Sequence, residues 1–345
     1  MAADPMGVAR QIDCLIAAGT AVPQGPQYLA SSTVLAVAKA LAAAGSKTAI
    51  LALDPALDPA SVTRESQDGI TIFHSSQPVS TLPALGYALG GPRILVLPNQ
   101  LATYRLLQTP GLDAVIWLGE DDLAQLGQQS LAAALHFWAD SDYVAAMAAS
   151  LLQLPVTAVT PPPGPAIANN SGNGTVIAQP NCVAVVGARP RDGIALTLAL
   201  AERRRDLRFI VVDWPYLAET ERQHVFARAA RCGNIDWRRP DSPAALIAAL
   251  LEAAVILVPA QQPIGHLDWI GHCRRAGRPL LGSDLGALPA LIGASGRLLA
   301  PTAALALWLE QLDALREQPA ASVAGAHIPA GSFADIVGRL MPPAT

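Results

Sequence analysis

Short, continuous apolar runs alternate with longer Ala-rich stretches along the chain. The first apolar run covers residues 14–19, and a helix-like stretch begins at Thr33 and ends at Gly45, where glycine suits a helix C-cap. The run KTAILALD follows at once, and its unbroken apolar character is typical of a strand buried on both faces. This β-α-β order predicts a parallel sheet with helices on both sides.

The alternation continues to the end of the chain. In the first half we expect further strands at residues 70–74, 93–97, 114–118, 136–139 and 156–159. In the second half the strand-like segments are CVAVVG, LRFIVVD, VILV and LLGS, and the helix-like segments between them are IALTLALAERRRD and residues 219–230. The pattern predicts an α/β protein with two doubly wound, Rossmann-like parallel sheets.

A segment rich in Pro, Gly, Asn and Ser separates the two halves. It reads PPPGPAIANNSGNGTVIAQPN over residues 161–181 and suits neither a helix nor a central strand. We therefore predict a first domain at residues 1–160, a linker at 161–181 and a second domain at 182–325. The tail SFADIVGRLM predicts one more amphipathic helix.

Composition agrees with two domains and excludes several functions. The chain has 345 residues, 52% of them hydrophobic, which is enough for two cores. Its net charge is −4 and its only lysines are Lys39 and Lys47, so binding to nucleic acid through phosphate neutralisation is not expected. The four cysteines are widely spaced, which indicates reduced, buried thiols and neither a zinc site nor a disulfide scaffold.

The mean hydropathy of +0.34 raises the question of a membrane segment. The best candidate, residues 244–260, is too short and carries Glu252 at its middle, so we interpret it as a helix that leads into a strand. The N-terminus does not resemble a secretory signal. We expect a soluble cytoplasmic protein, with peripheral association with the inner face of the membrane as the alternative.

Four segments in this order resemble a known family. They are QGPQYLASSTVLAVAKALAAAG, ADSDYVAAMAASLLQLPVTAVTPPP, VAVVGARPRDG, and the stretch from ILVPAQQPIGHLDWIGHC to GSDLGALPALI. Together they resemble retaining glycosyltransferases of the GT-B fold, in which two Rossmann-like domains face a cleft. The resemblance implies a nucleotide-sugar donor as substrate, no further cofactor, and a C-terminal segment, here residues 326–345, that crosses back to the first domain.

The resemblance also implies where the nucleotide binds. It places the nucleotide in the cleft against the second domain, at turns that carry Gly187, Gly265, Asp284 and Gly286 after predicted strands, and it matches Gly25 to the glycine-rich first turn of the first domain. Glycines in such turns let the backbone approach a phosphate.

The diphosphate of the donor needs positive charge. The family usually places an Arg and a Lys near the turn after the first strand of the second domain, but here Asp192 stands at the Lys position. Arg189 and Arg191 flank it, and guanidinium groups bind phosphate oxygens in a bidentate manner. These two arginines are our candidates for the role, and a solvated loop is the alternative.

The acidic residues of the family's donor site are absent. The family has two glutamates spaced by seven residues, whereas no Glu occurs between Gln261 and His272. Gln261 or Gln262 matches the first position, and Ile270 or His272 matches the second; Gln and His can still hydrogen-bond hydroxyl groups. His266 and His272 are six residues apart on a predicted helix and point in different directions, so we expect no metal site.

The first domain offers carboxylates on the acceptor side. The predicted strand AVIWL is followed by Gly119 and then by Glu120 and Asp121, which could orient an acceptor hydroxyl or assist its deprotonation. The alternative is that these residues begin a helix, because acidic side chains favour a first helical turn.

Two functions remain open at this point. One is a glycosyltransferase of glycan or glycoconjugate biosynthesis, with a nucleotide sugar and a glycan, lipid or protein acceptor as its partners. The other is a catalytically impaired protein of the same fold that serves as a partner or scaffold of another glycosyltransferase. Other enzymes with this fold, such as nucleotide-sugar epimerases, form a third class.

Overall fold

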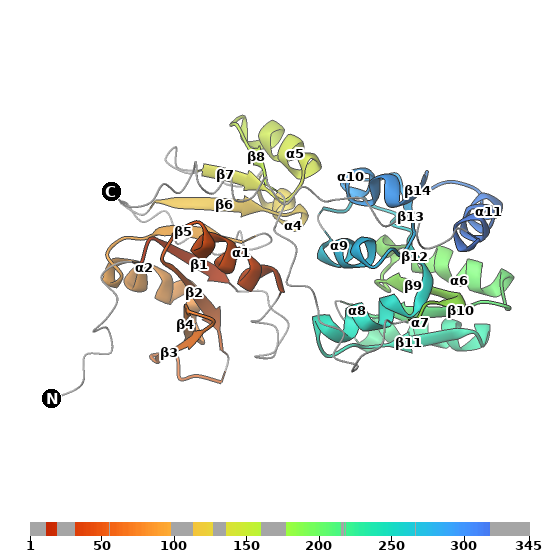
Figure 1. Cartoon of the computed structure of the whole chain (residues 1–345), viewed down its shortest axis with the longest axis horizontal. Coiled ribbons are helices and arrows are strands. Elements are labelled where there is room, and N and C mark those ends of the chain that lie inside the picture. Colours follow the sequence, from red (N-terminus) through yellow and green to blue (C-terminus); the bar gives the residue numbers. More distant parts are fainter. Residues whose placement is uncertain are drawn as a thin grey trace. The chain divides into compact units, whose positions relative to one another are not determined.

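In the computed structural model the chain divides into two compact units, Met1–Gly164 together with Pro329–Thr345, and Pro165–Ile328. The structure describes residues 12–18, 32–54, 56–97, 113–126, 136–159, 177–214, 217, 219–265 and 267–317. Most of the predicted linker and the whole predicted C-terminal helix lie outside these ranges. Each unit has a sheet with helices packed on both of its faces (Figure 1).

The sheet of the first unit has eight strands in the order β3-β4-β2-β1-β5-β6-β7-β8. The strands are β1 Cys14–Ala18, β2 Thr48–Leu53, β3 Val62–Gln67, β4 Ile70–Ser75, β5 Arg93–Val96, β6 Ala114–Leu118, β7 His136–Ala139 and β8 Thr157–Ala158. All neighbours pair in parallel except β3 and β4. The strands predicted from apolar runs are confirmed, with ends that shift by one or two residues.

The β3–β4 hairpin was not predicted. All six residues of β3 are exposed and none of its length forms an apolar run, so the strand lacks the pattern of a buried strand. Its turn has positive φ at both central residues, 51° at Asp68 and 81° at Gly69, which is typical of a two-residue hairpin turn. The Asp-Gly pair was the available sequence signal.

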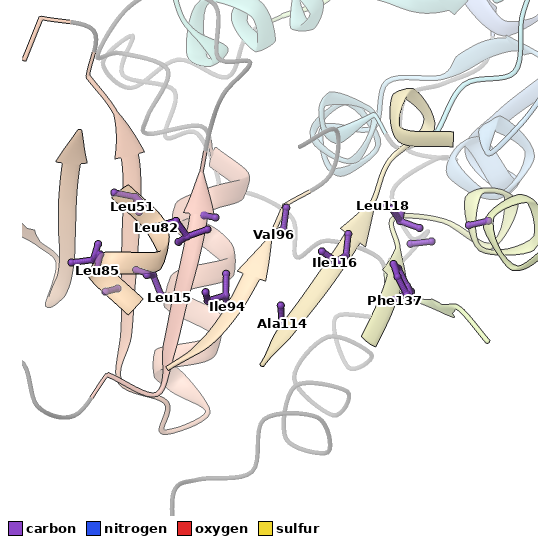
Figure 2. Close-up of a cluster of buried hydrophobic side chains, with 14 of the residues drawn as sticks. Leu15, Leu51, Leu82, Leu85, Ile94, Val96, Ala114, Ile116, Leu118 and Phe137 are labelled. Atoms are coloured by element: carbon purple, nitrogen blue, oxygen red, sulfur yellow. The ribbon is translucent and has the colours of Figure 1, made fainter. Parts of the chain in front are cut away.

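Helices cover both faces of this sheet. They are α1 Ser32–Ala43, α2 Pro78–Ala88, α4 Glu120–Leu126 and α5 Asp142–Leu152. α2, α4 and α5 pack on one face, where Figure 2 shows Leu82 of α2 over the strands that carry Leu15 and Leu51. α1 packs on the other face, where Trp117 and Trp138 form an edge-to-face pair with ring centroids 5.7 Å apart. Apolar contacts with helices therefore cover both faces of this sheet.

The sheet of the second unit has six strands, all parallel, in the order β11-β10-β9-β12-β13-β14. They are β9 Gln179–Val186, β10 Arg208–Val212, β11 Ile235–Arg238, β12 Ala253–Val258, β13 Leu280–Ser283 and β14 Gly296–Leu299. After β9, the strands β10 and β11 are added on one side of it, whereas β12, β13 and β14 are added on its other side. The order of the strands therefore switches direction between β9 and β12. In open α/β sheets such a switch point leaves a crevice at the carboxyl ends of the strands, where ligands bind.

Helices also cover both faces of the second sheet. They are α6 Ile194–Arg203, α7 Glu219–Cys232, α8 Pro243–Leu251, α9 Asp268–Arg275, α10 Leu288–Ile292 and α11 Leu305–Arg316. α6, α7 and α11 pack on one face, and α8, α9 and α10 pack on the other. The apolar run at 244–260 contains α8 followed by β12, as predicted. Within the described residues, no helix combines the length and apolar character needed to cross a membrane.

All four cysteines of the sequence lie in the described part of the chain. Cys14, Cys182, Cys232 and Cys273 are buried and none of them forms a disulfide, as predicted. Burial raises the pKa of Cys14 and of Cys273 to about 12, so these thiols stay protonated and unreactive near neutral pH.

One side chain connects α6 to the start of β10. The Nδ2 of Asn234 donates to the carbonyls of Ala201, Arg204 and Leu207 at 3.1, 3.0 and 2.9 Å. The first two carbonyls belong to the end of α6, where carbonyls lack partners within the helix. Asn234 therefore acts as a C-terminal cap supplied by a distant part of the chain.

We predict that Asn234→Ala lowers the free energy of unfolding by about 1–3 kcal/mol, because the substitution removes three hydrogen bonds to partly buried carbonyls. Urea denaturation measures this change. Gln223→Ala on the exposed face of α7 is the control, and its effect should stay within about 0.5 kcal/mol. Equal effects of the two substitutions would contradict the capping role.

Candidate functional site

Three segments leave the carboxyl edge of the second sheet near its switch point. The β9 turn comprises residues 187–193, the β12 loop residues 259–265 and the β13 loop residues 284–287. They contain most of the residues predicted to bind the donor, which confirms that those residues follow buried strands. Their roles in binding remain predictions.

Within the β9 turn, the side chain of Asp192 contacts the backbone of the same turn. Asp192 Oδ2 accepts a hydrogen bond from the Arg189 N–H at 3.0 Å. Gly187 has φ 93°, and a Cβ added to it would lie 2.5 Å from the carboxyl carbon of Asp192. Contact with Asp192 therefore accounts for the glycine at this position.

The β9 turn and the β12 loop are joined through their backbones. The Gln261 N–H donates to the Arg191 carbonyl at 2.8 Å. Gly193 has φ 83°, and a Cβ there would lie 1.8 Å from the Pro259 carbonyl oxygen. The two segments are thus packed so closely that residue 193 must be glycine.

The β13 loop is joined to the β12 loop in the same way. The Ala287 N–H donates to the Ile264 carbonyl at 2.8 Å. Gly286 has φ 57°, and a Cβ there would lie 2.4 Å from the same carbonyl oxygen. Gly265 is buried directly after Ile264, whereas Asp284 is exposed at the start of the β13 loop.

Cations and amides lie on this joined surface. Arg189 is half-buried, and 41% of the Arg191 side chain is exposed. Gln261 and Gln262 are exposed, and the Gln261 side chain donates to the Pro259 carbonyl at 3.0 Å. The structure therefore brings the arginines and glutamines of the sequence prediction to one edge of one sheet.

His272 has a different environment. It is only 7% exposed in the middle of α9, and its Nδ1 lies 3.0 Å from a terminal nitrogen of Arg275 in the same helix. Burial and then the charge of Arg275 lower the pKa of His272, while Asp268 opposes them. A neutral imidazole can accept the Arg275 N–H, so the structure gives His272 a partner inside its own helix. Ile270, the alternative match, is 1% exposed in the core.

Sequence reasoning missed Asp213. The ends of β9, β10 and β11 are paired, and the residues directly after them are Gly187, Asp213 and Arg239, which follow one another along the carboxyl edge. Asp213 is fully buried, its Oδ1 accepts the Leu217 N–H at 2.9 Å, and its Oδ2 lies 3.5 Å from Arg239 Nε. The signal was available, because Asp213 ends the strand-like run LRFIVVD.

In the first unit, Glu120 and Asp121 form the first turn of α4, directly after β6. The neighbouring Asp122 is 2% exposed, and its Oδ2 accepts the Gly119 N–H at 2.8 Å. The alternative interpretation of this segment as a helix start is therefore confirmed, and the acceptor role of Glu120 and Asp121 remains a prediction. Gly25 and His266 lie outside the described residues.

We predict that Gly193→Ala is far more destabilising than Gly233→Ala. Both glycines have positive φ, 83° and 73°, so both substitutions carry a backbone strain of about 1–2 kcal/mol. A Cβ at Gly233 meets nothing within 4 Å, whereas a Cβ at Gly193 collides with Pro259. Urea denaturation should show a loss on the order of 3 kcal/mol or more only for Gly193→Ala.

Amide hydrogen exchange gives a second measurement of the same contact. Exchange at the Gln261 N–H should accelerate in Gly193→Ala and stay unchanged in Gly233→Ala, because only the first separates this donor from the Arg191 carbonyl. Unchanged protection of Gln261 in Gly193→Ala would show that the two segments hold together without the glycine contact.

Comparisons with known proteins bear on the fold. Neither a protein-family model nor a curated protein matches this chain. Solved structures do match, among them a sucrose-phosphate synthase from Thermosynechococcus elongatus, with 14% identity, coverage of 95% of this chain and 97% of that chain, and a TM-score of 0.66.

Two further structures match over similar lengths. An α,α-trehalose-phosphate synthase from Burkholderia vietnamiensis is 12% identical, with coverage of 95% and 98% of the two chains and a TM-score of 0.65. The catalytic domain of starch synthase IV from Arabidopsis thaliana, bound to ADP and acarbose, is 11% identical, with coverage of 96% and 98% and a TM-score of 0.66. Identities this low show the fold alone, and the fold of this chain is GT-B, with two Rossmann-like units.

Proposed function

We propose that the protein is a glycosyltransferase, which moves a sugar from a nucleotide-sugar donor to an acceptor hydroxyl. The observation that carries this proposal is the junction at the switch point, where the Gln261 N–H donates to the Arg191 carbonyl at 2.8 Å. The junction joins the β9 turn, which carries the two arginines, to the β12 loop, which carries the two exposed glutamines, at the edge where open α/β sheets bind ligands. The fold, shared with solved glycosyltransferases, supports the same conclusion.

The proposed reaction breaks the bond between the anomeric carbon and a diphosphate oxygen. A bond forms from that carbon to the acceptor oxygen, and the acceptor proton leaves to a base. Negative charge grows on the departing diphosphate, so cations fixed in advance lower the energy of the transition state. We assign this role to Arg189 and Arg191, whose guanidinium groups suit phosphate oxygens.

The other polar groups receive binding roles in this proposal. Gln261 and Gln262 donate to and accept from sugar hydroxyls, since an amide does both. Glu120 and Asp121, at the start of α4, orient the acceptor hydroxyl or take its proton. Carboxylates at the end of a parallel strand are well placed for such contacts within their own unit.

A second function is favoured by a specific observation. Asp192 fills the turn that would otherwise receive a phosphate, and no Glu occurs between Gln261 and His272. These features suit a protein that has lost catalysis and acts as a partner or scaffold of another glycosyltransferase. Such a protein would keep the fold and bind nucleotides weakly.

The cellular setting belongs to the same proposal. We place the protein in the cytoplasm, in the biosynthesis of a glycan or glycoconjugate, with peripheral association with the inner face of the membrane as the alternative. The partners in this proposal are a nucleotide sugar and a glycan, lipid or protein acceptor, and the composition does not favour a nucleic acid.

We predict that nucleoside diphosphates or their sugars stabilise the protein. A ligand at 100 times its dissociation constant adds about 2.7 kcal/mol to the free energy of unfolding, which a thermal-shift screen with UDP, ADP, GDP and their glucose conjugates detects.

We predict that the double substitution Arg189→Ala with Arg191→Ala raises the dissociation constant of the diphosphate about tenfold to a hundredfold for each arginine. Binding of the bare nucleoside should change little.

The matched control is Arg203→Ala with Arg231→Ala. These arginines lie in the last turns of α6 and α7, at the other end of the helices from the β9 turn, and their removal changes the net charge equally. If both double variants weaken diphosphate binding equally, the assignment of Arg189 and Arg191 to the diphosphate is contradicted. If no nucleotide at millimolar concentration raises the melting temperature, donor binding is contradicted and the partner function is favoured.

A further inference from the structure

The carboxylate of Asp192 lies inside the turn assigned to the donor diphosphate. It accepts the Arg189 N–H at 3.0 Å, and only 17% of its side chain is exposed. A methyl group on Gly187 would lie 2.5 Å from its carboxyl carbon. Asp192 therefore fills the space over Gly187 that a phosphate would need in order to reach the backbone of the turn.

Two cations act on Asp192, and both belong to its own turn. Arg191 Nε lies 3.8 Å from Asp192 Oδ1, and Arg189 contributes both its N–H and its charge. The β12 loop meets the turn through backbone, where the Gln261 N–H donates to the Arg191 carbonyl. Burial raises the pKa of Asp192, and the N–H of Arg189 and the charges of Arg191 and Arg189 lower it by less. The carboxylate therefore takes up a proton more readily than an exposed one.

A diphosphate and an ionised Asp192 compete for the same groups. Both are anions, so both need the Arg189 N–H and the two guanidinium groups, and they repel each other at close range. A protonated Asp192 is neutral, and its O–H becomes a donor to a phosphate oxygen. One proton thus changes Asp192 from a competitor into a ligand-binding group.

We propose that Asp192 determines which ligands this turn accepts, and that a sugar-nucleotide diphosphate binds there with uptake of one proton by the Asp192 carboxylate. The inference rests on the proposed function. The proton comes from solvent, stays on a carboxyl oxygen of Asp192 while the diphosphate is bound, and returns to solvent when the diphosphate leaves.

The sign of the pH dependence follows from this linkage. The complex holds one more proton than the free protein, so affinity for the donor rises as pH falls, by up to about tenfold per pH unit. This dependence covers the range between the pKa of Asp192 in the free protein and its higher pKa in the complex. Below that range the carboxyl group is protonated in both states and the dependence ends.

Isothermal titration calorimetry with UDP-glucose and ADP-glucose tests the proposal between pH 5 and pH 8. These diesters carry no phosphate group that titrates near pH 6, unlike free nucleoside diphosphates. For the parent protein we expect weaker binding at higher pH and a net uptake of one proton, measured by repeating the titration in two buffers of different ionisation enthalpy. The proton count needs no substitution and therefore does not depend on how a variant folds.

Three variants complete the experiment. Asp192→Asn should bind the donor more tightly than the parent at pH 8, with no proton uptake, and Asp192→Lys should also bind more tightly because it adds a cation. Glu202→Gln removes the same charge in the last turn of α6, eight residues beyond its first, and should behave as the parent does. Their melting temperatures confirm that each variant is folded.

The outcomes separate this inference from the proposed function. A parent protein that binds the donor without proton uptake, and with the pH dependence of Asp192→Asn, overturns the role of Asp192 and leaves donor binding intact. If the parent and Asp192→Asn bind neither donor at any pH, and no nucleotide of the thermal-shift screen stabilises the parent, the proposed function fails, and the inference fails with it.

Discussion

The backbone contact between Gly193 and the Pro259 carbonyl is the constraint on which the candidate site depends. Because the strand order reverses between β9 and β12, the segments that follow these strands leave the sheet side by side. A residue with a side chain at position 193 would hold them apart. The contact fixes the start of α6 and, through the bond from the Gln261 N–H, the position of Arg191. The arrangement of the cations is thus set by a glycine that touches no ligand.

The glycines of the second unit have a common explanation inside the protein. Gly187 makes room for Asp192, Gly193 for Pro259 and Gly286 for Ile264. Glycine-bearing turns after parallel strands are often interpreted as places where the backbone approaches a phosphate. Here each glycine is required by a neighbouring part of the chain, so the case for a donor site rests on the arginines, the exposed amides and the fold.

The sequence predicted much of the fold and part of the site. Apolar runs located the buried strands, but β3, β11 and β14 lack such runs because they are exposed or half-buried, and so they were missed. Order along the chain placed Arg189, Arg191 and Gln261 after strands of one sheet. It could not show that the Asp192 side chain turns inward, which depends on a rotamer, or that Asp213 meets Arg239, which depends on the register of β10 with β11.

The exposed edge strand β3 has a consequence for self-association. In an antiparallel pair of strands, two residues that lie directly opposite each other project to the same face of the sheet. When two copies of β3 pair around a two-fold axis, one residue must therefore lie opposite its own copy. The two registers of greatest allowed overlap set Arg64 against Arg64 or Glu65 against Glu65. Like charges directly opposite each other destabilise a sheet. The hairpin therefore ends the eight-stranded sheet with an edge that repels its own copy, which protects the protein from edge-to-edge aggregation.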